Sequence, residues 1–155
     1  MNDKSALAAG GPLPPVLLCV AIILMALLHA FVPVARLFTV PWRFSGAVLI
    51  FAGLALNVWA DGLFKRAGTS VKLFDPSSSL VVDGPFSFSR NPMYLGMVLV
   101  LVGIAVGLGG ATPWLVIPVF AWLVDRRFVV PEERKLEATF GARFLEYKAR
   151  VRRWI

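Results

Sequence analysis

Most residues with useful chemistry lie in two separate blocks of the sequence. The first block, residues 84–96, reads GPFSFSRNPMYLG, and the second, residues 131–147, reads PEERKLEATFGARFLEY and leads on to a basic end. The 33 residues at 92–124 carry no charge. As one helix they would measure about 50 Å, more than a hydrocarbon core of about 30 Å accommodates, so this run must fold back on itself. The fold-back returns both blocks to one membrane face, where they can form a single pocket.

Glu133 is the strongest candidate for a functional carboxylate. Pro131 is expected to open a helix with Glu132 and Glu133 in its first turn, where the helix dipole favours negative charge. An apolar stripe on that helix would be formed by Leu136, Phe140, Phe144, Tyr147 and Val151. Glu133 falls within this stripe and Glu132 at its edge. A carboxylate on such a face destabilises the protein unless it forms an ion pair or serves a function. Glu133 therefore has either a functional role or a structural ion pair with Arg90 or Arg126.

The residues of the first block indicate the start of a helix at the membrane interface. Asn91 is a good N-cap and Pro92 a good first helical residue. Arg90 either binds an anionic ligand or extends to lipid phosphate. Tyr94 is either a site residue or an interfacial tyrosine. Gly96 permits close approach of a ligand or of a neighbouring helix.

The elements that must position these blocks are membrane helices. Hydrophobic residues make up 58% of the 155 residues and charged residues 16%, and the mean hydropathy is +0.76, whereas soluble domains carry about 25% charged residues. We therefore predict an all-α, polytopic membrane protein that forms a single integral domain over residues 1–155. Its four transmembrane helices are expected at about 13–31, 44–60, 92–108 and 113–130, with a cytoplasmic amphipathic helical segment at 131–150. Residues 107–113 form the turn between the last two spans, with Thr112 as N-cap before Pro113.

The charge distribution predicts the orientation. With four spans, both termini and the 62–91 loop share one side, which holds 14 of the 16 Lys and Arg residues. That side is expected to be cytoplasmic, as in a multi-pass protein of the bacterial inner membrane. Anionic lipid headgroups then account for the net charge of +7, and no nucleic-acid partner is expected. The single Cys19 excludes a disulfide within the chain and a cysteine-based zinc site, and no metal site is expected. Small residues in the spans leave room for a homodimer.

The two blocks, with the apolar hairpin between them, resemble the isoprenylcysteine carboxyl methyltransferase and phospholipid methyltransferase superfamily of integral membrane enzymes. The resemblance covers about residues 80–155. It implies that S-adenosylmethionine binds at the cytoplasmic face, at or near Arg90, Asn91, Pro92, Tyr94, Gly96, Glu132 and Glu133, with Tyr147 and Arg152 closing the site. The family often has His where this chain has Asn91, and Tyr where it has Phe86 or Phe144.

The expected function is therefore S-adenosylmethionine-dependent methyl transfer to a lipid-like or hydrophobic acceptor, a carboxylate, amine or thiol that enters from the bilayer. Glu133 and Arg90 are the expected catalytic residues. Glu133 is the best candidate to deprotonate an amine acceptor, and His29 and Asp61 are the next candidates. Two alternatives remain at this point. One is an NADPH-dependent membrane reductase of the sterol-reductase type, and the other is a non-catalytic membrane scaffold with the same fold.

Overall fold

The computed structural model describes residues 13–66 and 80–155. These residues form helices and no strands, so the predicted all-α class is confirmed. The α-helices are α1 (Pro14–Phe31), α2 (Ser45–Arg66), α3 (Pro92–Leu108), α4 (Val116–Val124), α5 (Val130–Phe140) and α6 (Ala142–Arg150). Short 3-10 turns cover Trp42–Phe44, Gly84–Ser87 and Thr112–Leu115, and a π-turn covers Asp125–Val129.

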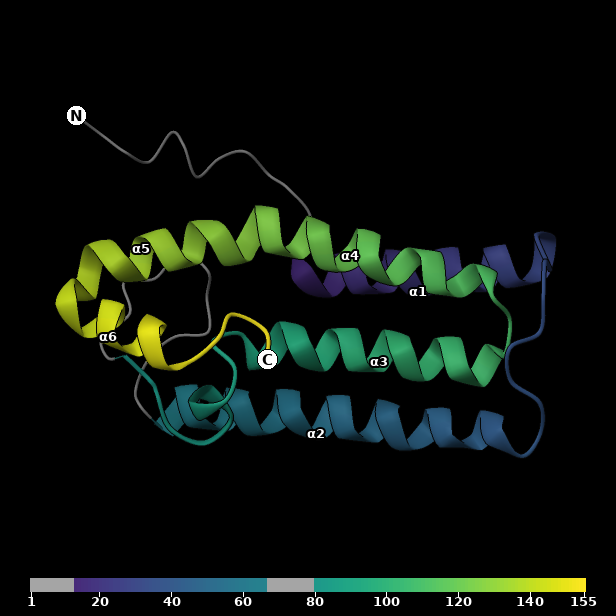
Figure 1. Cartoon of the computed structure of the whole chain (residues 1–155), viewed down its shortest axis with the longest axis horizontal. Coiled ribbons are helices and arrows are strands. Elements are labelled where there is room, and N and C mark those ends of the chain that lie inside the picture. The colour runs from purple at the N-terminus through teal and green to yellow at the C-terminus, as the bar shows by residue number, and fades with distance from the viewer. Residues whose placement is uncertain (1–12, 67–79) are drawn as a thin grey trace.

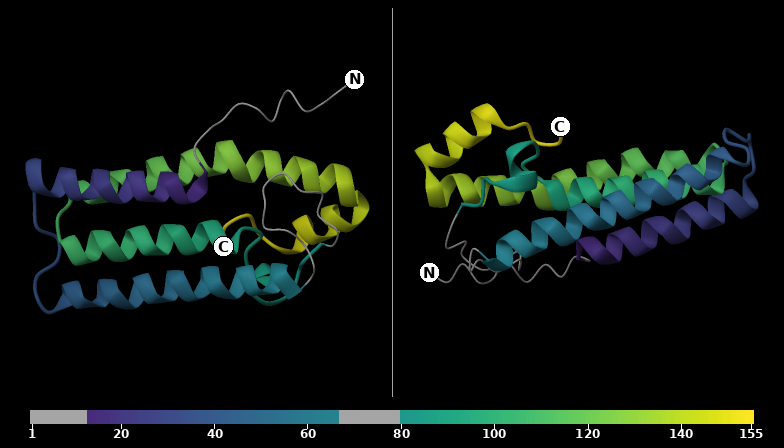
Figure 2. Two further views of the ribbon diagram at one scale, coloured as in Figure 1. Left: turned by 180° about the vertical axis from the view of Figure 1, so that it is seen from behind. Right: turned by 90° about the horizontal axis from the view of Figure 1, so that it is seen from below.

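Helix α3 lies in the middle of the bundle (Figure 1). Helix α2 runs along one side of it, and α1 and α4 lie on the other side. Helix α4, the π-turn and α5 form one long rod that extends past the start of α3, and α6 folds back beneath α5 (Figures 1 and 2). The chain segments at the start of α3 and after α6 therefore meet at the same end of the bundle.

Helices α2 and α3 approach each other closely through glycines. A Cβ atom built on Gly53 of α2 would lie 2.5 Å from the carbonyl oxygen of Gly96 on α3, and one on Gly103 would lie 2.5 Å from the carbonyl oxygen of Gly46. Small residues at such contacts let helix backbones come together, which is the usual packing mode in membrane bundles. Gly96 is thus occupied in helix packing in this structure, where it faces Gly53 and Asn57.

In the described residues the structure contains two candidate membrane helices, not the four spans that the sequence predicts. Only α1 and the continuous helical run Trp42–Arg66 are long and apolar enough to cross a membrane, with mean hydropathies of 2.4 and 1.8 in the described chain. Buried residues make up 17% and 11% of their apolar windows, so these helices present most of their apolar surface outward, unlike the core helices of a soluble protein. The predicted third span, Pro92–Leu108, has the expected bounds but is a shorter apolar helix of 17 residues.

The predicted fourth span, 113–130, is not a separate helix. It consists of a 3-10 turn, the nine residues of α4 and the π-turn, and it continues directly into α5. Pro131 lies in the first turn of α5 together with Glu132 and Glu133, as the sequence predicts, but α5 continues directly from the π-turn and does not start after a loop. The π-turn just before it accommodates a residue that lacks an N–H and clashes with the preceding turn.

Two further details of the hairpin and the C-terminal segment differ from expectation. The turn after α3 forms as predicted, with Gly109 in the left-handed region at φ +75°. Thr112, however, is not the N-cap, because that position is Ala111 and the Thr112 hydroxyl instead donates to the Leu28 carbonyl of α1 at 3.3 Å. The predicted segment 131–150 is broken into α5 and α6 at Gly141, whose φ is +52°.

Candidate active site

The two polar blocks meet at one end of the bundle, as the sequence predicted. Arg90, just before α3, lies with its Nη1 3.0 Å from Oε1 of Glu133 on α5. The two side chains are only 10% and 8% exposed. The hairpin of α3 and α4 produces this contact, since it returns the chain to the end from which α3 starts.

Glu133 also binds a second arginine. Arg153 donates from Nη2 to Glu133 Oε2 at 2.7 Å and from Nε to Oε1 at 3.2 Å, a bidentate pair. Its Nη1 lies 3.5 Å from Asp125, at the start of the π-turn. Hydrogen bonding to Glu133 is the main reason that the pKa of Arg153 is raised. Both oxygens of Glu133 are therefore occupied by arginines, and the structure contains the pair with Arg90 but not the alternative pair with Arg126.

The backbone that carries Arg153 is held against the start of α3. Asn91 donates from its side-chain amide to the Arg153 carbonyl at 3.1 Å, and the Ser89 hydroxyl donates to the same oxygen at 3.4 Å. The Arg90 N–H donates to the Arg152 carbonyl at 3.0 Å. Asn91 occupies the predicted N-cap position and Pro92 the first turn, but the Asn91 side chain makes no capping bond because it binds this C-terminal segment instead.

Glu132, next to Glu133, faces a different set of partners. The Tyr94 hydroxyl donates to Glu132 Oε2 at 3.3 Å, and the Tyr94 ring lies beside Phe128 with centroids 6.3 Å apart. Burial raises the pKa of Glu132, and the hydrogen bond from Tyr94 opposes this only in part. The two adjacent glutamates therefore sit in opposite environments, one between arginines and one between an aromatic hydroxyl and apolar surface.

The raised pKa of Glu132 predicts a pH-dependent stability that Glu132→Gln should remove. The folded chain keeps this proton in a pH range where the unfolded chain has lost it, so the stability contribution is full below the ordinary Glu value of about 4.3. It is lost as the pH rises through the folded-state pKa. The melting temperatures of the variant and the wild type can be measured between about pH 4 and pH 8. As the pH rises, the melting temperature of the variant should increase relative to that of the wild type. Parallel curves for the two proteins would contradict this assignment.

Several other candidate residues lie away from the Arg90–Glu133 pair. The Tyr147 hydroxyl donates to the Phe86 carbonyl at 2.6 Å, within a small core that includes Phe144 and Val151, and burial raises its pKa to about 12. Asp61 forms an ion pair with Lys65 on α2. His29 contacts Gly110 at the opposite end of the bundle, next to the α3–α4 turn. His29 is therefore too remote to serve chemistry at Glu133.

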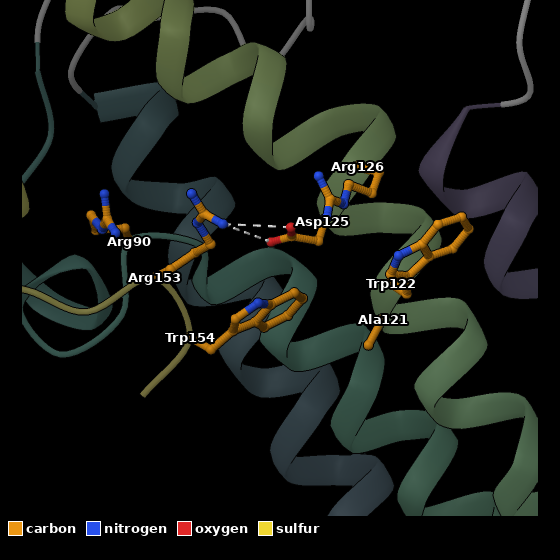
Figure 3. Close-up of a pocket in the computed structure, with 7 residues that line it drawn as sticks. All are labelled: Arg90, Ala121, Trp122, Asp125, Arg126, Arg153 and Trp154. Carbon is orange, nitrogen blue, oxygen red and sulfur yellow. Dashed lines mark hydrogen bonds and ion pairs between the residues drawn. The ribbon is translucent and has the colours of Figure 1, made fainter.

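An open pocket of about 520 Å³ lies between α4, the π-turn and the C-terminal segment (Figure 3). Its lining residues are Arg90, Ala121, Trp122, Asp125, Arg126, Arg153 and Trp154. Of the residues predicted to bind the cofactor, only Arg90 lines it, while Glu133 reaches it through Arg90 and Arg153. Sequence reasoning missed Asp125, Arg153 and the two tryptophans, although Arg153 and Trp154 belong to the basic end that follows the second block.

The lining can bind a molecule that carries both signs of charge. Three arginines and one aspartate face the same space, and the indoles of Trp122 and Trp154 provide flat apolar surfaces (Figure 3). The Nε of Arg90 is fully buried and has no hydrogen-bond partner among the described residues. No group of three or more His, Cys, Asp or Glu side chains suited to a metal ion occurs in the described ranges.

Comparison with known proteins gives one family match and one relative. The sequence model of the family described as phospholipid methyltransferase matches residues 42–143, more than half of the chain. An uncharacterized protein of Haemophilus influenzae is 35% identical over 63 residues, which span all of that protein and 41% of this chain. No solved structure matches the chain significantly. The family match includes both glutamates and Arg90 but ends before Arg153.

Proposed function

The chain belongs to the phospholipid methyltransferase family, and from this membership we propose that it transfers a methyl group from S-adenosylmethionine to a lipid-like acceptor at a membrane surface. The family supports methyltransferase activity in general. The observation that carries the finer proposal is the pocket at the junction of the two motifs, where arginines, an aspartate and two indoles converge. Family membership also favours this activity over the NADPH-dependent reductase considered from the sequence.

The cofactor's charges match this lining. Its carboxylate would bind the arginines that line the pocket, Arg90 and Arg153. Its ammonium and sulfonium groups would be balanced by Asp125 and by the faces of Trp122 and Trp154, because aromatic faces attract cations. A volume of about 520 Å³ lies within the usual range of cofactor sites, about 300–1,000 Å³.

Glu133 acts in this proposal as a positioning residue. Its two oxygens hold Arg90 and Arg153 at the pocket, so they are not free to receive a proton from an acceptor. This differs from the base role expected from the sequence. Asn91 contributes in the same way, because its amide fixes the backbone of Arg153.

Bound S-adenosylmethionine would supply an electrophilic methyl group on its sulfonium. Transfer of such a group is an in-line displacement, so the protein contributes mainly orientation and charge matching. Arg90 and Arg153 would fix one end of the cofactor, and Asp125 with the indoles would fix the cationic part. Trp122 and Trp154 would also keep water from the reacting atoms.

We propose that the acceptor reaches the pocket sideways from the bilayer. Leu115, Val119 and Trp122 lie on one face of the α4 rod and are 65%, 56% and 61% exposed. This apolar strip leads directly to Trp122 at the pocket edge. A hydrophobic acceptor can follow it without entering water, whereas the cofactor would arrive from the cytoplasm, on the side where most basic residues lie.

The matched variants Arg153→Gln and Arg152→Gln test the pocket assignment. Arg153 reaches both Glu133 and the pocket, whereas the side chain of its neighbour Arg152 is exposed and only its carbonyl is used. Loss of one charge-assisted contact costs about 1.5–3 kcal/mol, so Arg153→Gln should weaken S-adenosylmethionine binding by roughly 10- to 100-fold. Arg152→Gln should bind as the wild type does. Equilibrium dialysis with the detergent-solubilised protein measures both, and equal losses in the two variants would contradict the assignment.

A further inference from the structure

A second pocket lies at the opposite end of the bundle from the candidate active site. It has a volume of about 390 Å³ and opens between α2 and α3. Arg43 and Phe44 line it just before α2, Ala47 and Ile50 line it on α2, and Ile104 lines it on α3. The methyl-transfer proposal makes no use of this pocket.

Arg43 is the single charged residue of this pocket. Its Nε donates to the Gly107 carbonyl at 2.6 Å. Gly107 belongs to the last turn of α3, where carbonyls lack partners within the helix and attract cations. This contact explains the position of the side chain but uses only one of its donors. The terminal Nη1 and Nη2 groups make no hydrogen bond or ion pair with any residue of the described ranges.

The rest of the pocket is apolar, and the absence of a side chain at Gly107 leaves space in its wall. A Cβ atom on Gly107 would meet nothing within 4 Å, so the wall is open at that point. Ala47 and Ile50 continue along α2 at helical spacing, and Ile104 faces them from α3. The pocket thus combines one cation, just before α2, with apolar side chains along α2 and α3.

We propose that this pocket binds one anionic phospholipid, with its phosphate on Arg43 and an acyl chain beside Ala47, Ile50 and Ile104. Charge complementarity supports this occupant, because the Nη groups of Arg43 bind no described residue and the other described side chains of the lining are apolar. The site is separate from the methyl-transfer pocket and would stabilise the α2–α3 pair from the other membrane surface. The inference requires that the bundle lies in a bilayer but does not require that it is an enzyme.

Native mass spectrometry of the full chain tests the site, with phosphatidylglycerol and phosphatidylcholine of identical acyl chains as probes. The wild type is expected to retain one phosphatidylglycerol in preference to phosphatidylcholine. One basic residue near the membrane surface contributes about fivefold in binding, or about 1 kcal/mol, so Arg43→Gln should lower the preference by about that factor. Arg36→Gln is the matched control, because Arg36 lies at the same end of the bundle, is exposed and does not line the pocket.

A second pair of variants tests the apolar lining independently of charge. Gly107→Ala adds only a Cβ in open space and should retain lipid, whereas Gly107→Leu should fill the pocket and reduce retention of both lipids. Equal lipid preference in Arg43→Gln and the wild type would overturn the proposal. Full displacement of the lipid by millimolar inorganic phosphate would also overturn it, because the ligand would then be a free anion. Cofactor binding should not change in any of these variants, so failure here is distinguishable from failure of the proposed activity.

Discussion

Glu133→Gln is expected to lower the free energy of unfolding by about 3 kcal/mol, because it leaves the buried guanidinium of Arg90 without its counter-charge. Removing one partner of a buried ion pair typically costs about 3–5 kcal/mol, and the lower value applies because Arg153 is partly exposed and keeps Asp125. S-adenosylmethionine binding should fall at least about tenfold, since both arginines lose the carboxylate that positions them. Denaturant titration and equilibrium dialysis of the solubilised protein measure the two effects.

Glu132→Gln is the matched control for this substitution. It makes the same chemical change one residue earlier, but Glu132 is half-buried beside Tyr94 and forms no arginine pair among the described residues. A glutamine oxygen can still accept the Tyr94 hydrogen bond, so this variant should be as stable as the wild type or more stable at neutral pH. If both substitutions destabilised the protein equally, the assignment of the arginine pair to Glu133 alone would be wrong.

Gly53→Val is expected to destabilise the protein by about 2–3 kcal/mol or to prevent folding. The new Cβ would lie 2.5 Å from the Gly96 carbonyl and 3.0 Å from the Val100 amide nitrogen, so α3 would have to move away from α2. These are backbone atoms, which cannot yield as a flexible side chain can. Unfolding of the detergent-solubilised protein, followed by the loss of helical circular dichroism, measures the change.

Gly62→Val controls for the helix propensity of valine. Gly62 lies in the same helix, and a Cβ atom there would meet nothing within 4 Å. Both variants replace glycine by valine in a helix, so the change in intrinsic helix propensity is the same in each. The difference in stability between the two variants therefore reports the contact between α2 and α3. Equal stability of the two variants would show that α2 and α3 do not pack through these glycines.

The sequence predicted the parts of the site that depend on local signals. Asn91 and Pro92 define the start of α3, and its end at Leu108 agrees with the glycine-rich turn. The uncharged run at 92–124 is too long for one membrane helix, so it predicts a hairpin. Because a hairpin returns the chain to the end at which it starts, it also predicts that Arg90 and Glu133 lie close together. Glu133 interrupts an apolar stripe, which indicates a paired or functional carboxylate, and in the structure it is the buried carboxylate of the site.

The remaining features depend on tertiary contacts that local patterns do not encode. Thr112 has the residue type of an N-cap, but a partner on α1 takes its hydroxyl. Pro131 and the two glutamates lie in the first turn of α5, as their pattern predicts, but no local signal indicates the π-turn that joins α4 to α5 without a break. The break at Gly141 changes the direction of the chain, so the register that brings Arg153 and not Arg152 to Glu133 could not be predicted from helical periodicity. Hydropathy likewise identifies apolar segments without showing that, in residues 13–66 and 80–155, only two form long continuous helices of the required composition.

The most direct test of the central claim is incubation of the solubilised protein with methyl-labelled S-adenosylmethionine and a total lipid extract. The proposed function predicts saturable cofactor binding and transfer of label to a lipid-soluble product. Both should be greatly reduced in Arg153→Gln and retained in Arg152→Gln. Saturable binding without any labelled product would identify a non-catalytic scaffold with the same fold. Absence of binding at millimolar cofactor would contradict the account of the pocket itself.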